Sequence, residues 1–175
     1  MKSNHSFEKS YSLKGQTPVI KKSGTRYSCN VISMLSGKGV MRFMTFRENF
    51  TQNTFLHFLG RMIRKASKKI FLIVDNHRAH HSKKVQRWLE NKRDKMEIYF
   101  LPAYCPDMNP TELLNQDLKS NAFRGKMIHD QSELEIATRV YLGNIQFDEF
   151  KIRNFFCAEK VAFANHFSSN TYPTW

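Results

Sequence analysis

Two acidic residues, Asp75 and Glu112, stand where the chain could bring their side chains together. Asp75 directly follows a short apolar run at residues 70–74, and Glu112 opens a helical pattern after the next predicted strand. Because ligands of open α/β sheets bind at the carboxyl ends of the strands, both acids can reach the same edge of the sheet. Carboxylate oxygens suit Mg²⁺ and Mn²⁺. The pair therefore predicts a site for a divalent cation and metal-assisted phosphoryl chemistry.

Each acid also has a purely structural interpretation. Asp75 is followed by Asn76, and an Asp-Asn pair is common at the start of a turn. Glu112 would occupy the third position of a helix capped by Asn109, where its side chain can bond back to the N–H of the cap for about 1 kcal/mol. Position alone fits a turn and a site equally well for Asp75, whereas capping is the slightly better account of Glu112.

Histidines and basic residues surround the first acid. The loop after Asp75 holds three histidines, His77, His80 and His81. A soft-metal site is disfavoured because no cysteine lies nearby in the sequence, and loop histidines more often bond to backbone or face solvent. Contacts with DNA phosphates fit this region better, and a helix start adds N–H donors. The residues expected to bind DNA are Arg78, Lys83, Lys84, Arg87 and Lys119. A solvated charged surface explains these residues about as well.

The overall composition favours an anionic partner and a single domain. The 175 residues include 28 Lys and Arg against 15 Asp and Glu, and the formal charge of +13 favours nucleic acid. The length suits one domain with a core. No apolar run approaches the ~20 residues of a membrane-spanning helix, and no signal peptide is visible. We therefore expect a cytoplasmic protein without a membrane partner.

The elements that must position these residues begin with a hairpin. Residues 1–26 predict an irregular entry segment, since they are polar and interrupted by glycine and proline. Aromatic and β-branched residues at 27–35 and 40–47 flank Ser36-Gly37-Lys38-Gly39, which predicts two antiparallel strands. Apolar residues then recur at helical spacing, which predicts an amphipathic helix over 52–65.

Strands and helices alternate in the rest of the chain. The continuous apolar run at 70–74 predicts a strand buried on both faces, as in a parallel sheet. Ser82 can cap a helix that leads to a strand at 98–101. Further helices are expected at about 110–123, 131–143 and 148–164. The order predicts an α/β fold with a mixed sheet and flanking helices. This domain would span residues 27–165, with a C-terminal tail at 166–175.

Three segments resemble, in this order, the DDE domain of mariner-like bacterial insertion-sequence transposases. They are KGQTPVIKKSGTRYSCNVISMLSGKGVMRFMTF, FLIVDNHRAHHSKKVQRWL and IYFLPAYCPDMNPTELLNQDLK, and they cover most of the chain from Lys14 to about Phe123. The most specific part is LPAYCPDMNPTE, which is similar to the family's Leu-Pro, Tyr, Ser-Pro, Asn-Pro-x-Glu signature with Cys105 in place of the usual Ser. The resemblance implies a ribonuclease H-like fold in which three carboxylates hold two Mg²⁺ ions. By this likeness Asp75 is the second carboxylate and Glu112 is the third.

The resemblance also implies an activity. Two ions about 4 Å apart would activate a water against a phosphodiester and stabilise the leaving 3′ oxygen. The freed 3′ hydroxyl would then attack target DNA, which is the strand transfer of an insertion sequence. Basic side chains would neutralise phosphates without reading the sequence, so affinity should fall steeply with salt.

The first carboxylate of the family pattern has no counterpart. In the family, an Asp ends the first strand shortly before the segment that matches residues 14–18. Residues 1–74 contain no Asp, and their only acids are Glu8 and Glu48. Glu8 is a poor substitute because no apolar strand precedes it. The helix-turn-helix region that the family places before the catalytic domain is also absent. We therefore expect an N-terminally truncated transposase with lost or reduced activity.

The loss of the first strand would also affect stability. In a ribonuclease H-like sheet this strand is central and lies between the hairpin and the strand that ends at Asp75. Its absence would leave unpaired strand edges and uncovered apolar surface, so we expect a marginally stable or aggregation-prone domain.

Two other functions stay open. One is a non-catalytic, basic DNA-binding remnant of a transposase, and the other is a metal-dependent nuclease of a different kind, which would not need the loop signature. The expected partners are DNA and either a second copy of the chain or a full-length transposase.

Overall fold

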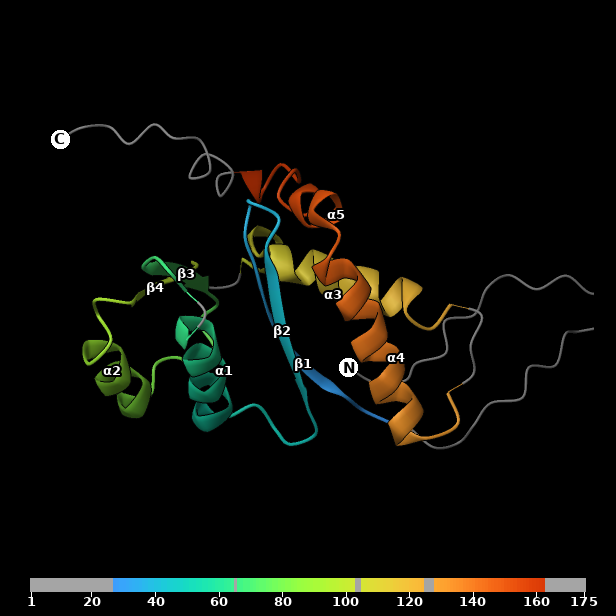
Figure 1. Cartoon of the computed structure of the whole chain (residues 1–175), viewed down its shortest axis with the longest axis horizontal. Coiled ribbons are helices and arrows are strands. Elements are labelled where there is room, and N and C mark those ends of the chain that lie inside the picture. The colour runs from blue at the N-terminus through green and yellow to red at the C-terminus, as the bar shows by residue number, and fades with distance from the viewer. Residues whose placement is uncertain (1–26, 65, 103–104, 125–127, 163–175) are drawn as a thin grey trace, which may run out of the picture.

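The structure, a computed structural model, describes residues 27–64, 66–102, 105–124 and 128–162 (Figure 1). Its elements, in chain order, are β1 (Asn30–Leu35), β2 (Met41–Phe46), α1 (Gln52–Arg64), β3 (Ile70–Val74), α2 (Lys83–Glu90), β4 (Met96–Phe100), the 3-10 helix η1 (Pro106–Met108), α3 (Pro110–Asn121), α4 (Gln131–Gln146) and α5 (Glu149–Asn154). The α/β class is confirmed. The predicted entry segment at 1–26 and the tail at 166–175 lie outside the described residues. None of the described helices is long and apolar enough to cross a membrane.

The predicted hairpin is confirmed. Strands β1 and β2 pair antiparallel, with Asn30 opposite Phe46 and Leu35 opposite Met41. The turn closes through a hydrogen bond from the Gly39 N–H to the Ser36 carbonyl oxygen at 2.9 Å. Gly39 has a φ of 83°, and a Cβ there would come within 2.9 Å of the Glu149 Cβ. Glycine is therefore needed both for the turn and for its close approach to α5.

The second sheet is parallel and carries helices on one face. Strands β3 and β4 pair in register from Ile70 with Met96 to Val74 with Phe100. Ser82 caps α2 as predicted, because its hydroxyl accepts a hydrogen bond from the Val85 N–H at 3.3 Å. The core of this region joins side chains of α1, α2 and both strands: Phe55, Phe58, Leu59, Met62, Leu72, Val74, Val85 and Met96.

The prediction that β3 is buried on both faces is wrong. Leu72 and Val74 are buried against the helices, but Phe71 is 60% exposed and Ile73 is 44% exposed. Helices α1 and α2 cover only one face of the two-stranded sheet, and no hydrophobic cluster of the described residues includes the other face. The apolar run therefore marks a strand whose second face is not covered by any described element.

The hairpin lies between two hydrophobic cores and packs against both. Ile32, Met34 and Met44 pack toward the core of α1 and β3. Val31 and Phe43, on the opposite face, pack against a second core of α3, α4 and α5. Figure 1 accordingly shows β1 and β2 between α1 and α2 on one side and α3 and α4 on the other. Within the described residues the two sheets share no strand pair.

The last two helices differ from their predicted bounds. Helix α4 continues through Gln146, somewhat beyond the predicted end. Helix α5 ends at Asn154 instead of continuing to residue 164, although residues 163 and 164 are not among those described. The chain leaves the helix and turns so that Phe156 and Val161 become buried. Tertiary packing here overrides the local helical pattern.

Candidate active site

Asp75 stands directly after β3 with its side chain 58% exposed. Its Oδ1 accepts a hydrogen bond from the His77 N–H at 3.0 Å and lies 3.1 Å from the His80 Nδ1. The hydrogen bond from His80 is the main cause that holds the pKa of Asp75 below its usual range. Partial burial opposes this effect and the His77 N–H supports it. The predicted turn is therefore present, but it occupies only Oδ1, and no described residue bonds to Oδ2.

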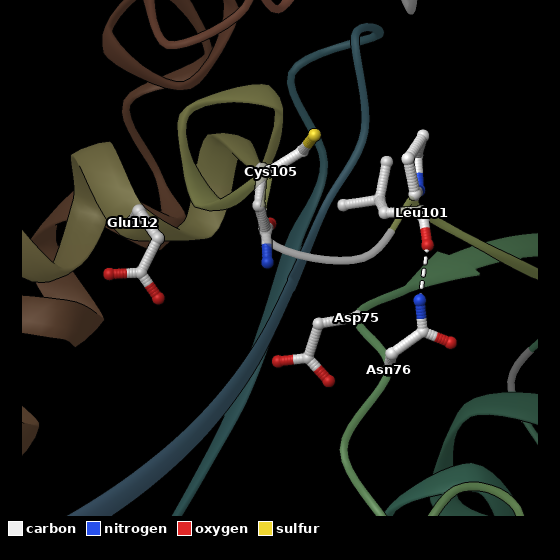
Figure 2. A pocket seen from close by; sticks show the side chains of 7 residues that line it. Asp75, Asn76, Leu101, Cys105 and Glu112 are labelled. Carbon is white, nitrogen blue, oxygen red and sulfur yellow. Dashed lines mark hydrogen bonds between the residues drawn. The ribbon is translucent and has the colours of Figure 1, made fainter.

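Asn76, the residue after Asp75, connects the ends of the two parallel strands through a hydrogen bond. The Asn76 amide Nδ2 donates to the Leu101 carbonyl oxygen at 2.6 Å, as Figure 2 shows, and its Oδ1 lies 3.1 Å from the His81 Nε2. The His81 ring stacks on Phe100, with centroids 4.2 Å apart. These contacts hold the loop after β4 next to Asp75.

Glu112 lies in the first turn of α3, which is placed by its cap and by its buried face. The Asn109 side chain accepts hydrogen bonds from the Thr111 N–H at 3.1 Å and the Thr111 hydroxyl at 2.7 Å. Pro110 begins the helix, and Leu114 is fully buried behind it. The expected bond from the Glu112 carboxylate back to the Asn109 N–H is not formed between these two described residues. The capping-box bond is therefore absent, because Thr111 and not Glu112 engages the Asn109 side chain, although Glu112 does lie in the first turn of the helix that Asn109 caps.

Both acids line one pocket of about 180 Å³ between the ends of β3 and β4 and the start of α3 (Figure 2). Asn76, Leu101, Pro102, Cys105 and Asn109 complete its lining. The pocket therefore brings together the Asp75-Asn76 turn and described residues of the segment that links β4 to α3.

The described residues show no third acidic ligand near the pocket. No group of three or more His, Cys, Asp or Glu side chains that could hold a metal ion occurs in the part of the chain that the structure describes. Glu48 does not line the pocket, and Glu8 lies outside the described residues. The described residues therefore offer two carboxylates for a cation.

The candidate DNA-binding residues divide into two places. Lys83, Lys84 and Arg87 are exposed on α2, and exposed Arg78 precedes them in the loop. Lys84 donates a hydrogen bond to the Asn53 side chain of α1 at 2.7 Å, so it also has a structural role. Lys119 is exposed at the end of α3, which Figure 1 shows across the hairpin from α2. None of the five lines the pocket.

Sequence reasoning missed the distinct position of His80. This side chain is only 8% exposed and lies against the ring of Phe55, with centroids 4.3 Å apart. His77 and His81 are exposed. No local sequence signal separates three histidines in one loop, since their difference arises from packing against α1.

Comparison with known proteins identifies one family. A family model described as DDE superfamily endonuclease matches residues 1–135. The match includes Asp75, Glu112 and every described element from β1 to the first turn of α4. No curated protein matches the chain.

Proposed function

The chain belongs to the DDE superfamily endonucleases, and from this we propose that its pocket is the DNA cleavage and strand-transfer site of a mariner-like insertion-sequence transposase. Asp75 and Glu112 would be its metal ligands and catalytic acids. The observation that carries the proposal is that both carboxylates line the same open pocket. The resemblance in the LPAYCPDMNPTE loop supports the finer assignment to the mariner-like type.

The donor set fits a hard divalent cation. The pocket contains carboxylate oxygens from two elements, and Asp75 is more than half exposed, so a hydrated ion can reach it. Mg²⁺ or Mn²⁺, when bound, makes water more acidic and offsets the charge of a phosphodiester. Cys105 also lines the pocket, but a thiolate is a soft ligand and does not favour Mg²⁺.

Side chains of this protein would bind the cation and orient the DNA. The Oδ1 of Asp75 is engaged by the loop, so Oδ2 would face the ion, while Glu112 would hold it from the opposite wall. Exposed basic side chains would bind the DNA backbone, namely Arg78, Lys83, Lys84, Arg87 and Lys119. DNA held by α2 would thereby be positioned near the end of β3.

We further propose that this chain alone has lost or reduced activity. The resemblance implies three carboxylates, whereas the described residues supply two at the pocket and residues 1–74 contain no Asp. A two-metal reaction needs ligands for both ions. A carboxylate from another chain, such as a full-length transposase copy, would then be required for efficient cleavage.

Nicking of supercoiled plasmid in Mn²⁺, followed by cleavage of DNA from the flanks of the gene, tests the proposal. We expect slow nicking that Asp75→Asn and Glu112→Gln abolish and that Glu90→Gln, an exposed acid at the end of α2, leaves unchanged. Robust cutting by the unaltered chain would refute the loss of activity. Cutting that persists in both pocket variants would refute the site.

A non-catalytic DNA-binding remnant is the second candidate, and the absence of a third acid at the pocket among the described residues favours it. DNA binding would then depend on salt but not on Mg²⁺ or on Asp75→Asn. Fluorescence anisotropy with a labelled duplex, measured at several salt concentrations, separates the two functions.

A further inference from the structure

The loop after β3 orients the Asp75 side chain before any ligand arrives. The His80 Nδ1 lies 3.0 Å from the Asp75 backbone oxygen and 3.1 Å from its Oδ1. Both atoms accept hydrogen bonds, so Nδ1 must carry a proton and donate to them. One imidazole N–H therefore bridges the main chain and the side chain of the same residue, which restricts rotation of the carboxylate.

The imidazole is itself fixed. His80 is 8% exposed, and its ring contacts those of Phe55 and Phe50, with centroids 4.3 and 5.6 Å away. Its backbone N–H donates to the His77 carbonyl oxygen at 2.9 Å. A buried ring packed against α1 has little freedom, so it can hold a partner in one orientation.

A neighbouring histidine has the opposite hydrogen-bond arrangement. The His77 Nδ1 accepts from the Ala79 N–H at 3.2 Å, so in His77 this nitrogen is unprotonated. His77 contributes its backbone N–H to Asp75, and only His80 contributes its ring. The loop thus distinguishes two histidines that the sequence does not.

We infer that His80 is a positioning residue that directs Oδ2 of Asp75, to which no described residue bonds, into the pocket, where a divalent cation would bind. The inference rests on the proposed function, because it treats Asp75 as a ligand. Groups that orient metal ligands commonly contribute 10- to 100-fold to metal affinity. The competing interpretation is that His80 only fills space against Phe55.

Two substitutions of His80 distinguish a role in positioning Asp75 from a role in packing against Phe55. His80→Phe keeps an aromatic ring against Phe55 but removes the donor. His80→Asn loses ring packing but places an amide donor close to the position of Nδ1. His57→Asn, at an exposed site on α1, is the matched control. Circular dichroism melting of each variant verifies that it is folded.

Mn²⁺ affinity is the first readout, from the loss of the free-ion electron paramagnetic resonance signal on titration with the whole chain. We expect His80→Phe to bind about tenfold more weakly, His80→Asn to bind nearly as well as the unaltered chain, and His57→Asn to be unchanged. Equal loss in both His80 variants, or none in His80→Phe, would overturn positioning. If Asp75→Asn abolishes binding in that case, the proposed site still stands. Absence of Mn²⁺ binding by the unaltered chain, or full binding by Asp75→Asn, would instead overturn the proposed site and this inference together.

The hydrogen-bond geometry can be tested without metal. Long-range ¹H–¹⁵N spectra of histidine side chains distinguish the two neutral tautomers, and the missing signals in His80→Asn assign His80. We expect His80 to carry its proton on Nδ1 and His77 to carry it on Nε2. A His80 protonated only on Nε2 would contradict the bridge to Asp75, whatever the metal results.

Discussion

The two acids of the pocket come from two regions that hold them differently. The Asp75 region comprises β3, β4, α1 and α2, and the Glu112 region comprises the hairpin with α3, α4 and α5. Asp75 lies in a loop, but its carboxylate is oriented by His77 and His80. Glu112 lies on a capped helix with a buried face, yet no described residue bonds to its carboxylate. The first acid is fixed at the side chain, and the second is fixed at the backbone.

The same comparison extends to packing. In the Glu112 region the hairpin and helices enclose the fully buried Leu114 and Leu142, and Asp117 joins Lys151 at 2.9 Å and Tyr141 at 2.6 Å. In the Asp75 region the sheet has one face against helices and one face exposed. We therefore expect substitutions to act on stability in the Glu112 region and on orientation or association in the Asp75 region.

The largest expected effect is on the core behind Glu112. Leu114→Ala should lower the free energy of unfolding by about 3 kcal/mol, because it leaves a cavity between α3 and the hairpin. Leu113→Ala, one residue away at a partly exposed position, should cost much less. Urea unfolding followed by circular dichroism measures both. Equal losses would show that α3 is not placed by its buried face.

A smaller effect on stability is expected at Asp75 when the pH is lowered. The folded state lowers the pKa of Asp75, so its contribution to stability is full above the unfolded value of about 3.9 and is lost as pH falls through the folded pKa. Because the side chain is more than half exposed, this contribution should be on the order of 0.5 kcal/mol.

Urea unfolding of the unaltered chain and of Asp75→Asn from pH 6 downward tests this linkage. The unaltered chain should be the more stable one at pH 6, and the two curves should converge as the carboxylate becomes protonated. Curves that stay parallel over the whole range would mean that the bonds from His77 and His80 do not favour the charged form.

The sequence predicted the elements well because their signals are local. The Ser36-Gly37-Lys38-Gly39 turn, the Ser82 cap and the Asn109-Pro110 helix start each depend on a few neighbouring residues, and all three are confirmed. The placement of Asp75 and Glu112 in one pocket could be anticipated, because strand ends and helix starts meet at one sheet edge. Their roles as metal ligands stay a prediction.

Features that depend on distant contacts could not be predicted. An apolar run looks the same whether one face of β3 or both are covered, so the exposure of Phe71 needed the structure. The separate position of His80 depends on α1, and the early end of α5 depends on burial of Phe156. Each of these outcomes is decided by packing, which local periodicity does not encode.

The smallest effect on stability, and the sharpest contrast between the regions, is expected at the exposed face of β3. Phe71→Ser should change the free energy of unfolding by no more than about 0.5 kcal/mol, yet reduce self-association. Phe71 and Ile73 of β3 and Tyr99 of β4 are exposed on the same sheet. Among the described residues β3 pairs only with β4, so its other edge is unpaired there. Sedimentation velocity over a range of concentrations measures the change.

Phe147→Ser is the matched control in the other region, since Phe147 is 88% exposed but lies at the end of a helix and not on a strand. If association requires both apolar surface and unpaired backbone, this substitution should leave the sedimentation profile unchanged. An equal reduction by both variants would show that exposed apolar area alone drives association. A reduction by Phe147→Ser only would place the contact on the helices of the Glu112 region, and β3 would then not be the vulnerable element.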